Sequence, residues 1–324
     1  MSGNSDARAA FLPGMRIVFL GTPDFAVPSL QALAVKHEVL AVFTQPDRPK
    51  GRGNRLSESP VKAAAKDLDL PTHQPERVRR REALELLRSL QPELMVVVGY
   101  GQIIPQTIID LPRYGILNVH ASLLPKYRGA APIQWAIANG EVETGVTIMQ
   151  IDAGLDTGDI LQKARLAIGP DEIAPELSLR LAAAGAELLL DTISQIERGT
   201  EHREKQNDAE ATFAPVLKKE DGLIEWSRPA RQIYNRLRGF TPWPGVYTRF
   251  RGQHLALLGA KPVGGRSLAP GTIHVDKRSL FVGCGGDTVL ELLELQIAGK
   301  KRMTAEAFLN GYRPLGNERL GDQS

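Results

Sequence analysis

Residues 116–132 read ILNVHASLLPKYRGAAP, a short apolar run that carries Asn118 and His120 and continues into a turn-rich loop. Ile116–Val119 has the form of a buried strand, and successive strand residues point to opposite faces of a sheet. Asn118 and His120 therefore share one face, whereas Val119 points to the other. Two polar side chains at one strand end form either a reaction site or a polar corner of the core whose hydrogen bonds are satisfied.

Five more apolar runs of strand length occur in the first half of the chain: Met15–Leu20, Val39–Thr44, Leu94–Val98, Val146–Gln150 and Ile160–Ala164. Helical patterns fall between some of them, at Pro60–Leu70 and Arg81–Leu90, and a long one covers Ala174–Arg198. This alternation predicts an α/β fold, with a doubly wound, mostly parallel, Rossmann-like sheet and right-handed crossovers. Ligands of such folds bind beyond the carboxyl ends of the strands, which is where His120 lies.

The chain has 324 residues, and a prior of roughly 150 residues per domain suggests two domains. Gly199–Ala211 is polar and charged, as is typical of a linker. Beyond Phe213 the sequence changes to short strand-like pieces punctuated by glycine and proline, which favour a small β-barrel or sandwich. We predict a catalytic domain at residues 1–206 and a second domain at residues 207–324.

Several classes of protein are disfavoured by composition. No apolar run approaches the roughly 20 residues that span a bilayer, and the first residues lack the apolar region of a secretory signal. The single cysteine, Cys284, excludes an internal disulfide and fits a reducing compartment, so we expect a cytoplasmic protein with Cys284 buried as a small hydrophobe. The histidines show no metal-ligand spacing, so no metal is expected. The early turn GTPDFA lacks the G-x-G-x-x-G spacing of a dinucleotide site.

Three aspartates, Asp152, Asp156 and Asp159, follow the strand predicted at Val146–Gln150. Asp and Gly are common in turns, so all three can simply be turn formers. Because the loop follows a strand of the same predicted sheet as His120, an aspartate there can instead orient the imidazole and stabilise its charged form. The pattern leaves both interpretations open.

Positive charge gathers in two places. The loop 47–56 carries Arg48, Lys50, Arg52 and Arg55 with two glycines, and it is either an ordinary solvated loop or a nucleic-acid contact. The stretch 226–262 holds six arginines and a lysine but no acidic residue. Four of these arginines lie near a predicted short helix, where they can contact phosphates: Arg228, Arg231, Arg236 and Arg238. We expect Trp243 in the core rather than on a stacking surface.

A motif of about forty residues joins these features. It resembles the signature of the 10-formyltetrahydrofolate-dependent formyltransferases. The matching residues are N-V-H-x-S-L-L-P-K-Y-R-G-A-A-P, then W-A-I-x-x-G-x-x-x-T-G-V-T, and then D-x-G-L-D-T-G-D. By this resemblance Asn118, His120 and Asp156 match the catalytic triad of the family. The resemblance also implies an OB-like second domain, 10-formyltetrahydrofolate as the formyl-donor cosubstrate, and a folate-contacting segment made of Ser122, Leu123, Leu124 and Pro125.

Within the family, the chain is most similar to the members that formylate the α-amine of methionyl initiator tRNA. FLGTPDFAVPSL, TQPDRPKGRGNRLSESPVK and NRLRGFTPWPGVYT all match, so the similarity runs from about Arg16 to Arg313. Gly99 and Val216 stand where alanine and lysine are usual. The resemblance implies tRNA as partner, with the loop 47–56 ordering against its acceptor end. We expect a monomer, because no exposed apolar stripe is evident.

The implied reaction makes demands on these residues. When the amine attacks the formyl carbon, negative charge develops on the formyl oxygen, and Asn118 and a protonated His120 are suitable donors to it. Asp156 would hold His120 and favour the imidazolium. Two alternatives stay open: a folate-dependent transferase or hydrolase that acts on a small amine, a sugar nucleotide or water, and a non-catalytic RNA-binding protein on an inactive scaffold. The complete Asn118–His120–Asp156 set argues against the second alternative.

Overall fold

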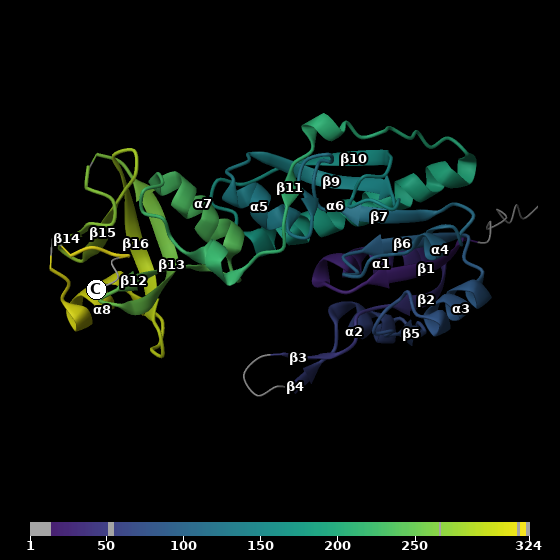
Figure 1. The fold of residues 1–324 in the computed structure, drawn as a ribbon, viewed down its shortest axis with the longest axis horizontal. Helices are drawn as coiled ribbons and strands as arrows, with labels where there is room; N and C mark the ends of the chain where they lie inside the picture. Colours follow the sequence, from purple (N-terminus) through teal and green to yellow (C-terminus); the bar gives the residue numbers. More distant parts are fainter. Residues whose placement is uncertain (1–13, 51–54, 266, 316–317, 322–324) are drawn as a thin grey trace, which may run out of the picture. The chain divides into compact units, whose positions relative to one another are not determined.

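The computed structural model describes residues 14–50, 55–265, 267–315 and 318–321. Its contacts divide the chain into two compact units. One contains Met1–Arg128, Gly145–Ala164 and Arg180–Ala211, and the other contains Gly129–Thr144, Arg165–Leu179 and Thr212–Ser324. Figure 1 shows the elements of both units, and each unit is described by itself below.

A seven-stranded sheet in the order β10-β9-β7-β6-β1-β2-β5 forms the centre of the first unit. The strands are β1 (Arg16–Gly21), β2 (Glu38–Phe43), β5 (Thr72–His73), β6 (Leu94–Val98), β7 (Ile116–His120), β9 (Glu143–Gln150) and β10 (Ile160–Ala167). Strands β1, β2, β5, β6 and β7 pair in parallel, whereas β9 runs antiparallel to β7. All six predicted strands are present, and the mostly parallel α/β sheet is confirmed.

The helices of this region are α1 (Val27–Lys36), α2 (Pro60–Asp67), α3 (Arg81–Leu90), α4 (Gln106–Ile109) and the long α6 (Ala174–Arg198), with 3₁₀ turns η1 (Asp24–Ala26) and η2 (Asp208–Glu210). Helix α6 packs closely on the sheet at Gly185, where an added Cβ would lie 2.9 Å from Val119 Cγ1 and 3.3 Å from Val146 Cγ1. Val119 thus faces α6. Asn118 and His120 face the other side of the sheet, as the alternation of strand residues predicts.

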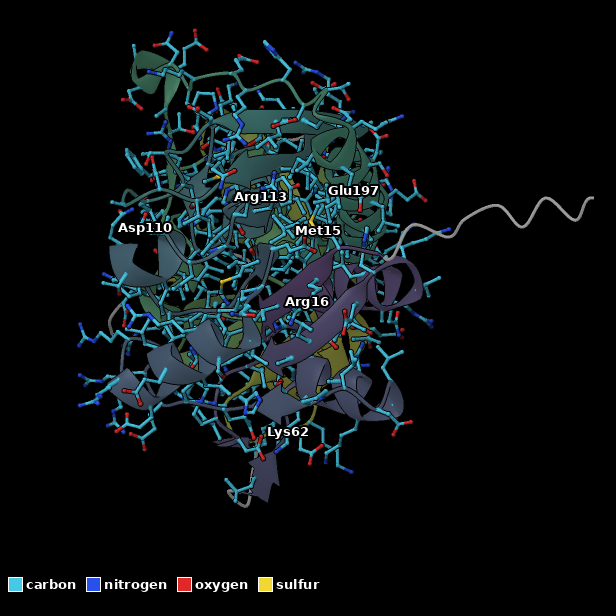
Figure 2. The ribbon with its side chains drawn as sticks, turned by 90° about the vertical axis from the view of Figure 1, so that its right-hand side faces the viewer. Met15, Arg16, Lys62, Asp110, Arg113 and Glu197 are labelled. Carbon is cyan, nitrogen blue, oxygen red and sulfur yellow. The ribbon has the colours of Figure 1, made fainter. Side chains whose placement is uncertain are left out.

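A β-hairpin of β3 (Arg48–Lys50) and β4 (Arg55–Ser57) projects beside α2 (Figure 1). Its foot is fixed through Asp47, whose Oδ2 lies 2.6 Å from Lys62 Nζ and whose Oδ1 accepts from Gln74 Nε2 at 2.7 Å. Figure 2 labels Lys62 at this foot. The hydrogen bond from Lys62 lowers the pKa of the Asp47 carboxyl below its usual value. The base of the basic loop is therefore ordered by charge-assisted hydrogen bonds.

The second unit is built on an antiparallel sheet in the order β12-β13-β16-β15-β14, with β17 paired to β16. Its strands are β12 (Val246–Phe250), β13 (Gln253–Val263), β14 (Ile273–Asp276), β15 (Ser279–Cys284), β16 (Thr288–Ile297) and β17 (Met303–Thr304). Its other elements are α5 (Pro132–Ala138), α7 (Ala230–Phe240), α8 (Ala305–Tyr312) and the turn η3 (Lys219–Gly222); short strands β8 (Arg128–Gly129) and β11 (Phe213–Ala214) complete the fold.

Alternate residues of these strands enter one apolar core. Leu255, Leu292 and Phe308 have no exposed surface, and Phe308 lies edge-on to Phe250 with ring centroids 5.1 Å apart. Cys284 is 1% exposed within this core, and burial raises the pKa of its thiol to about 12. The prediction that Cys284 packs as a small hydrophobe is confirmed.

The polar segment that was expected to be a linker packs against the first unit. Ile160 and Glu204 exchange two backbone hydrogen bonds, at 2.8 and 2.9 Å, so the segment lies beside the start of β10. The first unit accordingly extends to Ala211. The boundary between residues 206 and 207 stays a prediction. Among the described residues, no helix is long and apolar enough to cross a membrane.

Candidate active site

Three polar side chains meet beyond the carboxyl end of β7. Asn118 Nδ2 lies 3.4 Å from Asp156 Oδ1, and His120 Nδ1 lies 3.7 Å from Asp156 Oδ2. Asn118 and His120 come from β7, whereas Asp156 comes from the loop after β9, and β7 and β9 pair directly, His120 opposite Thr147. The imidazole is 6% exposed and the Asp156 side chain 16%, while Asn118 is half-buried. The structure thus brings together the three residues that the sequence motif singles out.

The second nitrogen of His120 is also engaged. His120 Nε2 lies 2.9 Å from the backbone oxygen of Tyr127, and because a carbonyl oxygen only accepts, Nε2 carries a hydrogen. When the imidazole is protonated, its Nδ1–H faces Asp156, so both N–H groups are taken. The expected donation from His120 to a formyl oxygen therefore does not fit this arrangement. Asn118 has two amide hydrogens and faces Asp156 with the nitrogen that carries them, so it is the better donor.

The loop that supplies Asp156 has an unusual backbone. Asp156 has φ +52°, a left-handed conformation that costs a non-glycine residue roughly 1–3 kcal/mol. Asp152 is the turn former of the loop, because its Oδ1 accepts from Gly154 N at 3.0 Å and from Thr157 Oγ1 at 2.7 Å. Gly158 admits no side chain, since a Cβ there would lie 1.8 Å from the Gln150 carbonyl oxygen. Asp152 and Asp156 thus differ in their surroundings: Asp152 bonds within the loop, whereas Asp156 faces Asn118 and His120.

The segment Ser122–Pro125 turns away from β7 on a buried hydrogen-bond network. Thr147 Oγ1 donates to Ser122 O at 2.7 Å and accepts from Leu124 N at 3.2 Å, while Ser122 Oγ donates to Lys126 O at 2.6 Å. Ser122 and Leu124 are buried, and Leu124 packs against Met149 and Ile160. Only Leu123 and Pro125 of this segment keep partly exposed side chains. The side chains of Ser122 and Leu124 are therefore not exposed to a ligand, whereas those of Leu123 and Pro125 are.

Two further residues support the Asp156 loop, and sequence reasoning missed both. The guanidinium of Arg128, which is 4% exposed, donates to Gln206 Oε1 from Nε at 3.1 Å and from Nη2 at 2.8 Å, and Nη2 also reaches Asp208 Oδ1 at 2.8 Å. Gln206 Nε2 in turn donates to the carbonyl oxygens of Asp156 and Gly158, both at 2.8 Å. Arg128 stands in the quoted motif, but Gln206 lies in a polar segment that gives no periodic signal.

The basic hairpin is only partly described. Arg48 is exposed at the start of β3, Lys50 and Arg55 belong to β3 and β4, and Arg52 lies outside the described residues. Of the arginines near α7, Arg231 is exposed and lies over the Tyr234 ring, 5.6 Å from its centroid.

The other three arginines near α7 have protein partners. Arg228 pairs with Glu225 at 3.0 and 3.1 Å, and Arg236 donates to Asp221 O at 2.9 Å. Arg238 is 5% exposed and donates to Gly169 O, Glu172 O and Asn235 Oδ1 at 2.8–3.1 Å. The prediction that Arg238 contacts a phosphate is therefore wrong: this arginine fixes a loop onto α7.

Trp243 also differs from its prediction. It follows α7 in the segment TPWPG and is 56% exposed, so the expectation of a core tryptophan is wrong. Prolines on both sides, Pro242 and Pro244, follow cis peptide bonds. The ring is accordingly free to act as a stacking surface.

A cavity of about 520 Å³ lies near the amino ends of the parallel strands, away from the triad residues in the sheet. Its lining includes Met15 before β1, His37 before β2, Glu93 before β6, and Glu197 of α6; Figure 2 labels Met15 and Glu197. His37 Nδ1 lies 3.7 Å from Glu197 Oε1, and burial lowers the pKa of His37. None of Asn118, His120 and Asp156 lines this cavity. Among the described residues, no group of three or more His, Cys, Asp or Glu side chains could hold a metal.

Comparison with known proteins gives full-length matches. The formyl transferase family matches residues 15–193, and the formyl transferase C-terminal domain matches residues 216–313. A methionyl-tRNA formyltransferase of Solibacter usitatus is 57% identical over 310 residues, covering 95% of this chain and 99% of that protein. The methionyl-tRNA formyltransferase of Geobacter sulfurreducens is 50% identical, covering 96% of this chain and 98% of its own length.

Solved structures share the fold at lower identity. The sugar 3N-formyl transferase WlaRD, crystallised with dTDP and 5-N-formyl-THF, has a TM-score of 0.65 at 19% identity and covers 89% of this chain and 99% of its own. HypX from Aquifex aeolicus, in complex with tetrahydrofolic acid, has a TM-score of 0.59 at 18% identity, covering 92% of this chain and 47% of its own. The matches at high identity extend over both units, and the chain therefore belongs to the formyl transferase family.

Proposed function

We propose that the protein transfers the formyl group of 10-formyltetrahydrofolate to the α-amine of methionyl initiator tRNA, giving N-formylmethionyl-tRNA. The observation that carries this proposal is the placement of Asn118 and His120 at a strand end, each within 4 Å of the Asp156 carboxylate. It is supported by relatives at 48–57% identity, named methionyl-tRNA formyltransferase, that align with 93–96% of this chain. A small amine or a sugar nucleotide is a weaker candidate acceptor, because the sugar formyltransferase resembles this chain at only 19% identity.

Asn118, His120 and Asp156 have separate roles in the proposed reaction. Asn118 donates an amide hydrogen to the formyl oxygen as it becomes negatively charged, and one such donor is worth roughly 3–4 kcal/mol in other enzymes. Asp156 takes the proton of the attacking amine, because its carboxylate has lone pairs beyond those that face Asn118 and His120, and His120 Nδ1 orients this carboxylate. The proton then passes to the leaving N10 of the folate. Positioned acid–base groups of this kind contribute about 10²–10⁴-fold in rate.

The acceptor tRNA needs positive surface, which two exposed arginines supply: Arg48 on the hairpin and Arg231 on α7. Contacts to phosphates are salt-sensitive and largely independent of sequence. Lys50, Arg52, Arg55, Arg228 and Arg236 remain candidates for the same role. The exposed Trp243 can stack on a base, because every base has a π-face. We place the protein in the cytoplasm, where translation begins, and propose that it acts as a monomer.

The proposal is tested by mixing the purified protein with 10-formyltetrahydrofolate and methionyl initiator tRNA and measuring formylmethionyl-tRNA by mass. Methionyl elongator tRNA, free methionine and an amino-sugar nucleotide serve as alternative acceptors. Formylation confined to the initiator tRNA supports the proposal. If the folate loses its formyl group without a tRNA product, the protein is instead a hydrolase or a transferase to a small amine.

A further inference from the structure

We propose that Arg128 and Gln206 are positioning residues that hold the carboxylate of Asp156 against His120. This inference deepens the proposed function and rests on it for the roles of Asp156 and His120. Neither Arg128 nor Gln206 reaches the reacting atoms through a described contact. Their effect on the reaction passes through the backbone of the loop after β9.

Gln206 pins this loop at two points. Its Nε2 has two hydrogens, and the carbonyl oxygens of Asp156 and Gly158 each lie 2.8 Å from it. The two carbonyls belong to alternate residues, so one carboxamide fixes the backbone on both sides of Thr157. Asp156 needs such support, because its φ of +52° is unfavourable for a residue with a side chain. The orientation of the Asp156 side chain follows from this backbone conformation.

Arg128 fixes Gln206 in turn. Two guanidinium nitrogens of Arg128 donate to the same oxygen, Gln206 Oε1, which defines the orientation of the carboxamide and turns its NH2 group to the loop. Arg128 is 4% exposed, so its guanidinium is held by neighbours rather than by water. Asp208, 81% exposed, supplies the opposite charge through Nη2 at 2.8 Å. A buried charge with fixed partners is a rigid support.

The chain segment around Arg128 also holds His120, the partner of Asp156. Tyr127, directly before Arg128 in the chain, accepts from His120 Nε2 at 2.9 Å. Two consecutive residues thus fix the two partners. The backbone carbonyl of Tyr127 orients the His120 imidazole, and Arg128, through Gln206, orients the loop that carries the Asp156 carboxylate. The backbone bridge between Ile160 and Glu204 brings the segment that carries Gln206 alongside the loop. The distance of 3.7 Å between His120 Nδ1 and Asp156 Oδ2 is therefore fixed from both sides.

Three variants separate positioning from simple stability. Gln206→Glu keeps an acceptor for Arg128 but replaces the NH2 group that binds the two carbonyls. Gln206→Met removes both functions. Asp208→Asn is the matched control, because it alters only the exposed partner of Arg128. We expect Gln206→Glu to lower the melting temperature less than Gln206→Met does, because it keeps the acceptor for Arg128.

For formyl transfer to methionyl initiator tRNA, kcat of Gln206→Glu and Gln206→Met should fall by up to about 100-fold, the effect of a misplacement near 1 Å. KM for the tRNA should stay unchanged, and Asp208→Asn should behave as the wild type. If Gln206→Glu keeps the kcat of the wild type, or if the loss appears only in Gln206→Met together with a lower melting temperature, Gln206 is structural and the inference is overturned.

A second measurement does not depend on the reaction. The ring ¹⁵N chemical shifts of His120, assigned with His120→Asn, are recorded for the wild type, Asp156→Asn, Gln206→Glu and Asp208→Asn at one pH. Gln206→Glu should move the Nδ1 shift in the same direction as Asp156→Asn, whereas Asp208→Asn should not. An Nδ1 shift in Gln206→Glu identical to the wild type contradicts the inference. If the wild type fails to formylate any tRNA, the proposed function fails, and the NMR result still decides the positioning role.

Discussion

Replacing Thr147 by valine should loosen the turn that follows β7. Thr147 has no exposed surface, and valine has nearly the same shape, so the substitution removes one hydroxyl and creates no large cavity. The hydroxyl joins two backbone groups: it donates to Ser122 O at 2.7 Å and accepts from Leu124 N at 3.2 Å. Ser122 and Leu124 are 0% and 1% exposed, so water does not replace either bond.

The magnitude follows from these two groups. An unsatisfied buried donor or acceptor costs about 1–3 kcal/mol, so two of them cost about 2–6 kcal/mol. In the valine variant the hydroxyl no longer has to be desolvated on folding, which offsets part of this cost. We therefore expect the closed turn to lose about 2–3 kcal/mol of stability, near the lower end of the range. At 1.4 kcal/mol per factor of ten, the turn should open roughly 30- to 140-fold more often.

Amide hydrogen exchange measures this opening directly. Lys126 N donates to Leu123 O at 3.1 Å and is untouched by the substitution, so its exchange rate reports whether the turn stays closed. KM for 10-formyltetrahydrofolate should rise in the same variant, because the family resemblance implies that Leu123 and Pro125 of this turn contact the folate. Thr192→Val is the matched control: Thr192 is also fully buried, but its hydroxyl lies 2.8 Å from Leu188 O within α6 and 2.8 Å from Gln162 Oε1, away from the turn.

The reasoning is refuted if Thr147→Val leaves both the exchange of the Lys126 amide and KM for the folate at wild-type values. It is also refuted if Thr192→Val raises KM for the folate equally, because the effect would then come from general destabilisation.

Three further predictions concern other parts of the chain. Gly158→Ala should lower both activity and melting temperature, because the added Cβ would lie 1.8 Å from a carbonyl oxygen, while Gly311→Ala, in open space on α8, should be neutral. Arg231→Gln should raise KM for the tRNA at unchanged melting temperature, and Arg238→Gln should lower the melting temperature; the reverse pattern would contradict the burial argument. Burial lowers the pKa of His37 in the folded protein, so that below the ordinary histidine pKa of 6.5 the unfolded chain binds more protons than the folded one. The melting temperature should therefore fall on acidification from neutral pH, and it should fall less in His37→Gln.

Much of the first unit could be predicted from hydrophobic pattern because its central strands, β1, β6 and β7, are buried on both faces. Continuous apolar runs such as LMVVV at Leu94–Val98 have few alternative interpretations, and this strand begins and ends at the predicted residues. The shared face of Asn118 and His120 follows from strand geometry alone, and Val119 does pack against α6. Asp156 could be singled out only by the family motif, because the loop holds three aspartates that the sequence alone does not distinguish.

The rest depended on contacts between distant residues, which pattern does not encode. Gln206 follows Arg128 by 78 positions and lies in a polar segment that resembles a linker, yet its carboxamide binds the loop that carries Asp156. Arg238 looks like a surface arginine until three acceptors surround it. Trp243 suggests core by residue type, but its proline-flanked segment leaves it exposed. The contacts of both His120 nitrogens likewise could not be predicted from sequence, since Tyr127 O and Asp156 meet them only in the folded chain. These contacts leave Asn118 as the proposed donor to the formyl oxygen.

The central claim is that the formyl group passes directly to the acceptor amine at Asn118, His120 and Asp156. The most direct test is a rapid-quench experiment over one turnover, with labelled formyl-folate and methionyl initiator tRNA, on the wild type and Asn118→Ala. The account predicts that label moves to the tRNA with none bound to the protein, and that Asn118→Ala slows this step by about 10²–10³-fold at unchanged tRNA and folate affinity. Label accumulating on the protein, or an Asn118→Ala rate equal to that of the wild type, would contradict it.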